Sequence, residues 1–319
     1  MTAARTTPSG LSSPADPVQE QVVPSPSAAS GRPPLGRSRP VKERTGWRPA
    51  TVVSVLTVVV VLAYAVVVPL IADAPDLAAD LGNSRRPPSA AHWFGTDANG
   101  HDLVTRIAQA LRVSLLIATV CAVSATVIGV LVGGVAAVCG GWVDAVLMRL
   151  ADAVNALPHL LLGIVIVALF KGSVAAIVIS VVATHWSFIA RLVRSAALTA
   201  RAMEYVDSAY LAGAGRWHVL RRHLLPAAIG QAVIGVTLML PHAIWHESAL
   251  SFLGLGLSPD QPSLGTLLAQ SRGEVLLGGW WTLVCPAAPL VAVTLATSGL
   301  AAALQRRLAP PADSREVSS

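Results

Sequence analysis

Long apolar runs alternate with short polar stretches along most of the chain. The first run, residues 50–72, has no charged residue and is long enough to cross a bilayer, which takes about 20 residues. Further apolar runs cover residues 113–140, 153–170, 174–190 and 227–247, and a last one begins at Trp280 and Trp281. The pattern predicts an all-α integral membrane protein with six transmembrane helices.

Glycines and prolines modify three of these runs. Gly129, Gly133 and Gly134 lie in the second run, where small residues are expected to let a neighbouring helix approach closely. Pro158 is expected to kink the third run, and Pro241 to interrupt the fifth.

The polar stretches predict the connections. Residues 73–112 are expected to form a polar outer segment, residues 141–152 a short inner turn, and residues 171–173 a tight outer hairpin. Residues 248–278 are expected to form a second outer segment.

Composition supports a membrane protein and leaves two tails outside it. Of 319 residues, 54% are hydrophobic and 13% charged, which is too apolar for a soluble domain of this size. The net charge of +6 comes from arginines beside the apolar runs and in residues 1–49, a Pro- and Ser-rich stretch that we expect to be a disordered basic tail. This distribution favours orientation in the membrane over nucleic-acid binding, and it predicts that the tails at 1–49 and 309–319 are both cytoplasmic.

Few residues of the chain suggest disulfides, ATP binding or ion coupling. Cys121, Cys139 and Cys285 are odd in number and lie in apolar stretches, so they indicate packing. The lysines, Lys42 and Lys171, do not follow a glycine, so the chain lacks a phosphate-binding loop. The spans also contain almost no ionisable residues of the kind that ion-coupled carriers use, so energy is expected to come from another subunit.

A polar, arginine-bearing island at residues 204–226 separates two apolar runs. Asp207 falls in a segment expected to be helical, Gly213 allows a turn, and residues 216–224 are expected to form a second short helix. Pro226 suits the first turn of the following span. The island therefore predicts a two-helix projection on the cytoplasmic surface.

This island resembles the cytoplasmic loop of the membrane subunits of binding-protein-dependent ABC importers. The resemblance implies that the projection docks on an ATPase subunit, although Asp207 and Ser208 replace the Glu and Ala of the family pattern. The coupling residues that it indicates are Glu204, Tyr205, Asp207, Ser208, Ala209, Gly213, Ala214, His223, Leu225 and Pro226.

Two outer segments are similar to the dipeptide, oligopeptide and nickel permeases of that family. One is Phe94-Gly95-Thr96-Asp97, continued by Gly100-His101-Asp102 and Arg112-Val113-Ser114-Leu115, with His101 where the family usually has Arg. The other covers residues 248–265. Asp97 and Asp102 could contribute to an ion site, but two acids supply too few oxygens for calcium, so a structural turn is favoured.

The resemblance implies a type I ABC importer permease in the bacterial inner membrane. It would form half of an alternating-access pathway for di- or oligopeptides or for nickel or a metal chelate. Its expected partners are a homologous second permease, an extracytoplasmic substrate-binding protein and two ATPase subunits that bind ATP and magnesium, while this chain holds no cofactor or metal and is not an enzyme. The alternative is an ATP-independent membrane channel or receptor subunit.

His242 and His246 are the candidate cargo contacts within the spans, with Glu247 beside them. They are four residues apart on one helical face, a spacing that can chelate a divalent ion, and the sequence places them near the outer mouth. The competing interpretation is a polar pair at the end of the helix. His218 and His223 lie on the inner loop and are expected to be polar surface residues.

Overall fold

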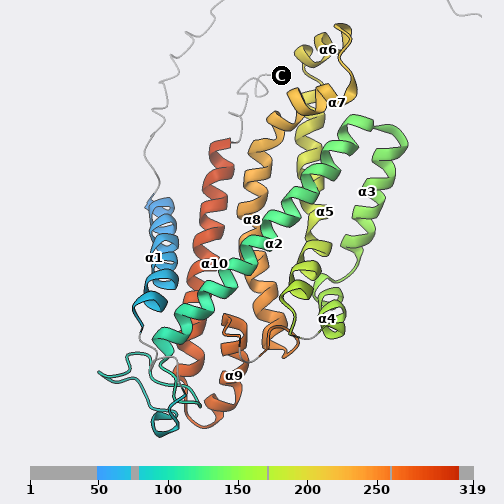
Figure 1. The fold of residues 1–319 in the computed structure, drawn as a ribbon. Helices are drawn as coiled ribbons and strands as arrows, with labels where there is room; N and C mark the ends of the chain where they lie inside the picture. Colours follow the sequence, from blue (N-terminus) through green and yellow to red (C-terminus); the bar gives the residue numbers. More distant parts are fainter. Residues whose placement is uncertain (1–48, 73–78, 171, 259–260, 309–319) are drawn as a thin grey trace, which may run out of the picture. The chain divides into compact units, whose positions relative to one another are not determined.

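The computed structural model describes residues 49–72, 79–170, 172–258 and 261–308. The predicted tail before residue 49 and the tail at 309–319 lie outside the described residues. In the part that is described, the regular elements are helices, and two of them, α6 and α7, form one end while α9 lies at the other (Figure 1).

The helices follow the chain in this order: α1 Pro49–Ile71, α2 Leu103–Cys139, α3 Gly141–Ala156, α4 His159–Leu169, α5 Val174–Arg201, α6 Glu204–Leu211, α7 Arg216–Val219, α8 Leu225–Phe252, α9 Leu264–Leu276 and α10 Trp281–Leu308. A 3₁₀ turn, η2, covers Leu81–Asn83, and a π-helical segment, η3, covers Leu220–Leu224 between α7 and α8.

Five helical runs in the described residues are long and apolar enough to span a membrane: α1, α2, α5, the continuous run Arg216–Phe252, and α10. The sixth span is the pair α3 and α4, bent by 83°. Its break falls at Leu157 and Pro158, because a proline disfavours helical geometry in the residue before it. The described residues therefore contain five spans, and the six predicted ones where the bent pair counts as one span, with its break at the predicted Pro158.

The predicted inner turn at residues 141–152 is wrong, because these residues belong to α3. Gly140 and Gly141 make the turn instead, at φ of 60° and 54°. Asp144 of α3 accepts two hydrogen bonds of 2.5 Å from the Arg194 guanidinium of α5. The polar residues that suggested a loop in the sequence thus hold the amphipathic helix α3 against α5.

Other boundaries also differ from the prediction. Helix α2 begins at Leu103, ten residues before the predicted start, because the Asp102 carboxylate accepts a hydrogen bond from the Val104 N–H at 2.7 Å and caps the helix. The last outer segment contains α9, which starts in a capping box formed by Ser263 and Thr266. Helix α8 continues to Phe252 through Pro241.

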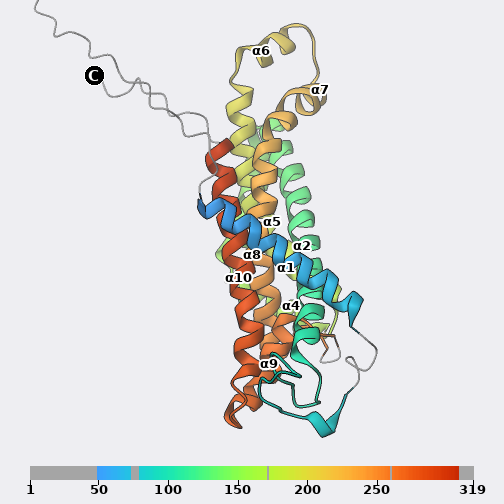
Figure 2. The same cartoon turned by 90° about the vertical axis from the view of Figure 1, so that its left-hand side faces the viewer.

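Helices α2 and α5 cross with their backbones in close contact (Figures 1 and 2). A Cβ atom on Gly129 would lie 2.5 Å from the Ile189 Cβ, and one on Gly133 would collide with the Ala190 carbonyl oxygen. The prediction that these glycines serve a close helix neighbour is confirmed.

We predict that Gly133→Ala destabilises the protein even though alanine favours helix by about 1 kcal/mol over glycine. The added methyl group meets backbone, which cannot move aside without separating α2 from α5. Gly273→Ala in α9 is the control, because nothing lies within 4 Å of the added atom. The thermal unfolding midpoint of the detergent-solubilised protein should fall for Gly133→Ala and stay or rise for Gly273→Ala; equal midpoints would contradict the packing role.

Candidate functional site

Residues 204–226 fold as a two-helix projection beyond the spans, as the sequence predicts. Helix α6 is followed by a turn in which Gly213 adopts φ of 87°, a conformation that favours glycine. The turn is closed by the Ala214 N–H, which donates to the Ala209 carbonyl at 3.0 Å. Helix α7 and η3 then lead into α8, with Pro226 in its first turn.

The projection is anchored to the ends of two spans. Its anchors are buried apolar side chains that pack against α2 and α5: Val206, Val219, Leu220 and Leu224 of the projection meet Ala137 and Val138 of α2 and Ala197 and Ala200 of α5. The Arg201 guanidinium also donates to the Ala137 carbonyl at 2.7 Å. A displacement of the projection therefore acts directly on α2 and α5.

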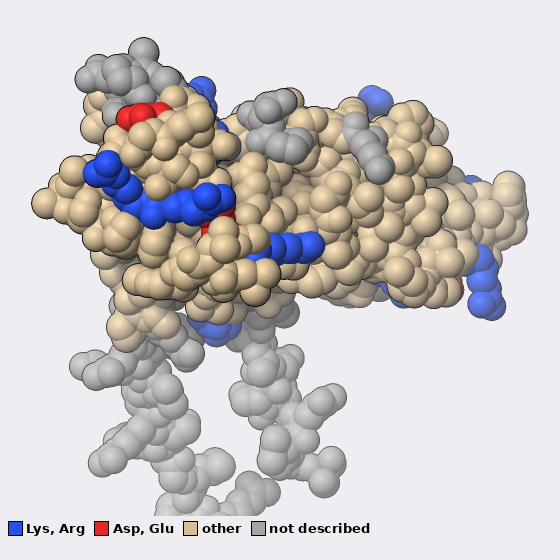
Figure 3. All heavy atoms as spheres, turned by 90° about the horizontal axis from the view of Figure 1, so that it is seen from below, with Lys and Arg blue, Asp and Glu red and all other residues tan. Residues whose placement is uncertain are grey.

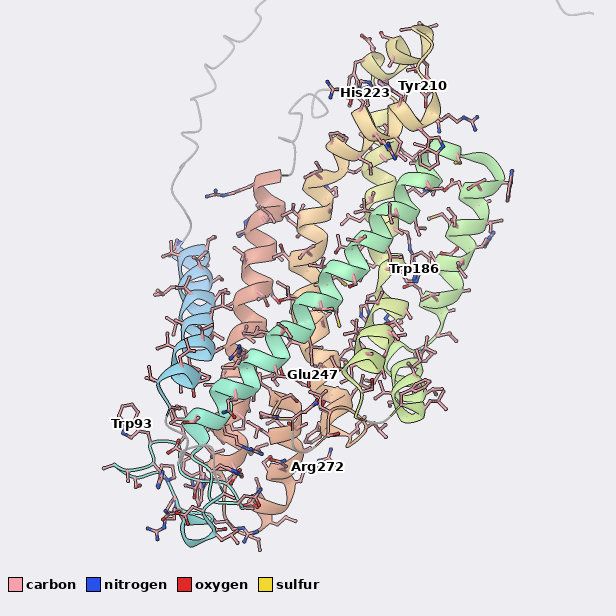
Figure 4. The ribbon with its side chains drawn as sticks, in the orientation of Figure 1. Trp93, Trp186, Tyr210, His223, Glu247 and Arg272 are labelled. Atoms are coloured by element: carbon pink, nitrogen blue, oxygen red, sulfur yellow. The ribbon has the colours of Figure 1, made fainter. Side chains whose placement is uncertain are left out.

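The outer surface of the projection carries several of the predicted coupling residues. Glu204, Tyr205, Asp207, Ser208, Gly213 and Pro226 are exposed, while Ala209, Ala214, His223 and Leu225 are partly buried. The rings of Tyr205 and His223 lie 5.6 Å apart, and His223 and Tyr210 both lie in this region in Figure 4.

Sequence reasoning missed two apolar residues at the tip. Leu211 is 89% exposed and Trp217 is 64% exposed. Both lie outside the motif that marked this loop, so the only available signal was an apolar side chain in a polar stretch. Exposed leucine and tryptophan beside polar groups are suited to contact with another protein.

At the opposite end, the two acids considered for an ion site hold a turn. The Asp97 carboxylate accepts hydrogen bonds of 2.9 Å from the N–H groups of Asn99 and His101 and lies 3.4 Å from the Arg106 guanidinium. Asp102 caps α2 and lies 2.8 Å from the His92 ring. Both carboxylates are thus engaged within the segment, in agreement with the structural interpretation.

Most of the surface seen in Figure 3 is uncharged, and at one place on it basic side chains lie beside an acidic one. One such pair joins the segment after α1 to α9, where the Arg85 guanidinium lies 3.1 Å from the Glu274 carboxylate. The Arg272 guanidinium stacks 3.7 Å from the centre of the Phe252 ring and donates to the Phe252 carbonyl. These contacts fix α9 to the end of α8.

The three candidate pathway residues on α8 differ in how far they are buried. His242 is exposed, His246 is buried, and Glu247 is fully buried at 0% exposure. Because α8 continues to Phe252, His242 lies ten residues, about 15 Å, from the helix end, which is deeper than the sequence predicts.

Glu247, labelled in Figure 4, is held by serine hydroxyls of α2 and α8. Its carboxyl group accepts hydrogen bonds from Ser114 of α2 at 2.8 Å and from Ser251 at 3.0 Å. The Ser114 oxygen in turn accepts from the Leu264 N–H at 3.1 Å. Glu247 therefore links α2 and α8 to the start of α9 and is enclosed away from the histidines.

His246 instead joins a cluster that the sequence did not reveal. Its ring lies 4.7 Å from that of His185 on α5, and His185 lies 5.2 Å from His159 on α4 and 6.2 Å from His242. The prediction that the spans hold almost no buried ionisable groups is wrong for His185, His246 and Glu247. An ionisable residue inside an apolar run, as His185 is, was the available signal.

Six spans, a projection fixed to two of them and polar groups within the helix bundle define a multi-pass membrane permease. A family model described as "Binding-protein-dependent transport system inner membrane component" matches residues 125–310. The chain belongs to this family, and it is a permease subunit of an ABC importer with the type I fold. Importers of this family work with an ATPase and a substrate-binding protein.

Individual relatives agree with this assignment. The dipeptide transport system permease protein DppC of Bacillus subtilis (strain 168) is 37% identical over 224 residues, which cover 70% of this chain and 70% of that protein. A putative peptide transport system permease protein of Brucella suis biovar 1 is 36% identical over 258 residues, or 80% of this chain and 86% of the relative. A putative peptide permease protein of Brucella ovis is 34% identical over 235 residues, 73% and 78% of the two chains.

We predict that Glu247→Ala destabilises the end of the bundle that carries α9. The change leaves the buried hydroxyls of Ser114 and Ser251 without their acceptor, at a cost of about 1–3 kcal/mol for each unsatisfied group. Glu247→Gln keeps an oxygen acceptor and should cost less. Thermal unfolding of the purified protein measures both, and a loss from Gln as large as that from Ala would contradict the acceptor role.

Proposed function

We propose that the α6–α7 projection couples this permease to ATP hydrolysis by a partner subunit. The observation that carries the proposal is the way the projection is built: its inner side packs into the ends of α2 and α5, and its outer side presents Leu211 and Trp217. The family resemblance of residues 204–226 supports the same role. A contact at the tip can therefore reach the spans through packed side chains.

We further propose that the importer contains a homologous second permease, two ATPase subunits and a substrate-binding protein. ATP and magnesium belong to the ATPase subunits, and this chain contributes half of an alternating-access pathway. The motifs indicate peptides or a nickel or metal-chelate cargo. Peptides are the better supported of these, because the similar proteins from Bacillus and Brucella are named for dipeptides and peptides.

The proposed orientation places the projection and both tails in the cytoplasm. Arginines are concentrated at this end, which favours the cytoplasmic side. Its basic residues are Arg191, Arg194, Arg201, Arg216, Arg221 and Arg222, with Arg306 and Arg307 in the last turn of α10. In Figure 1 the end of α10 points toward the end of the bundle that carries α6 and α7.

Single cysteines should confirm this orientation in a background that lacks the three native ones. Gly215→Cys on the projection should react with a membrane-impermeant thiol reagent only when the cytoplasmic face is open to it. Gln261→Cys before α9 should react only from outside. Both positions are exposed, so their reactivity depends on side and not on burial; the reverse pattern would overturn the orientation.

Changes in the projection should uncouple transport while leaving the protein inserted. Gly213→Trp forces a large side chain into a left-handed backbone conformation, and Asp207→Lys reverses a charge on the exposed side of α6. In the reconstituted importer, both variants should lower ATP hydrolysis stimulated by the binding protein with its peptide. We expect a loss of roughly tenfold, which corresponds to about 1.4 kcal/mol of lost coupling.

Gln261→Cys is the matched control, since it is exposed at the opposite end of the bundle. It should retain stimulated hydrolysis. Unchanged stimulation in both projection variants would contradict the coupling role, and ion conduction by the purified chain alone would favour the channel alternative.

A further inference from the structure

Four of the eight histidines of this chain gather at one place in the spans. His159 comes from α4, His185 from α5, and His242 and His246 from α8. His185 is central, with ring centres 5.2, 6.2 and 4.7 Å from those of the other three.

The remaining four histidines have other surroundings. His92 and His101 lie at the outer end, each within 3.0 Å of an aspartate, and His218 and His223 lie on the projection. Among the described residues, no acid forms such a pair with the clustered rings, and the neighbouring Glu247 faces its serines. The cluster is thus a group of imidazoles without a carboxylate partner.

Three of the clustered histidines lie at similar distances from one end of the bundle. Helices α4, α5 and α8 meet at their outer ends, where the Gly172 N–H donates to the Gly256 carbonyl at 3.1 Å. His159, His185 and His242 are ten or eleven residues from these ends, or about 15 Å along each helix, against a hydrocarbon core of about 30 Å. At this depth, ionisable side chains face the bundle interior or a water-filled path, and lipid is excluded as a partner.

Hydrogen bonds fix the orientation of two of the rings. Nδ1 of His242 lies 3.0 Å from the Leu238 carbonyl, and Nδ1 of His185 lies 2.9 Å from the Val181 carbonyl. A carbonyl only accepts, so Nδ1 of His242 carries the hydrogen. Nδ1 of His185 also lies 2.7 Å from the Thr184 hydroxyl, and because that hydroxyl itself donates to the Ser180 and Val181 carbonyls, Nδ1 is assigned the hydrogen there too. Each Nε2 then keeps its lone pair, and this pairing of one ring N–H with a backbone carbonyl is typical of metal-ligating histidines.

The spacing of the rings also suits one ion. Imidazole nitrogens at about 2.0–2.1 Å from a metal place two ring centres roughly 4.5–6.4 Å apart for bond angles between 90° and 180°. The three measured spacings fall within this interval. Within the described residues, no three donors are already arranged around one point, so at least one ring must turn on binding. We assign this movement to His242, which is exposed and whose hydrogen bond to the Leu238 carbonyl breaks as the ring turns.

We propose that the histidine cluster binds a divalent transition-metal ion of the kind imidazole prefers, such as cobalt, nickel or zinc. His185 and His242 supply Nε2, and His159 and His246 complete the set. The ion then bridges α4, α5 and α8. This metal site depends on the proposed function at one point: the ion reaches the exposed ring of His242 from the translocation pathway.

Cobalt is the probe, because imidazole-bound Co²⁺ absorbs visible light. The tag-free assembly of permeases and ATPase subunits should develop this absorption on addition of Co²⁺ and lose it on addition of a chelator. The double change His185→Ala, His242→Ala should abolish the signal, and so should His185→Gln, His242→Gln, which keeps side chains of similar size. Assembly with the ATPase subunits checks that each variant is folded.

The single change His218→Ala is the control, because it removes an exposed ring of the projection that is not one of the coupling residues and should leave the signal unchanged. A wild-type assembly without the absorption, or the same absorption in the cluster variants, would overturn the metal site. Peptide-stimulated ATP hydrolysis by the wild-type assembly tests the proposed function separately. Stimulation without cobalt absorption rejects only the metal site, and cobalt absorption without stimulation rejects only the proposed coupling to peptide transport.

Discussion

The contact between α2 and α5 determines the positions of most other elements. It depends on Gly129 and Gly133, which let α2 approach the backbone of α5 at Ala190. Both helices continue past this crossing, to Cys139 and Arg201, and their ends form the seat of the projection. A methyl group at the crossing would therefore disturb the α6–α7 projection as well as the bundle.

A second constraint is that lipid offers no hydrogen-bond partners, so polar groups in the spans must find them within the protein. Adjacent residues of α8 meet this requirement in different ways. Glu247 is enclosed by serines that connect the outer segments to the bundle, whereas His246 faces the other histidines. Successive residues of a helix point in directions about 100° apart, which allows one helix to serve a structural network and an open cluster at the same depth.

Features that depend on neighbouring residues could be predicted from the sequence, and features that depend on residues far apart in the chain could not. The projection was predictable because Gly213 and Pro226 act locally on the backbone, and the kink at Pro158 was predictable for the same reason. Helix α3 was missed because its aspartates read as loop residues until their arginine partners on α5 are in place.

The contacts between residues within the spans could be recognised only once the fold was known. Ser114 and Glu247 are 133 residues apart, and the histidine cluster draws on three helices, so no local pattern contains either arrangement. The sequence indicated His242 and His246 through their helical spacing alone. It offered no such spacing for His159 or His185, whose role depends on how α4 and α5 are placed against α8.

Helix α7, η3 and α8 form one continuous helical run from Arg216 to Phe252, and the π-helical turn lies near its projecting end. A π turn accommodates one extra residue, which makes it a natural place for twist between the helical segments on either side. Trp217 and His242 lie about 38 Å apart along this run at 1.5 Å per residue. A movement that starts at Trp217 and travels along this run must therefore pass the π-helical turn before it reaches His242.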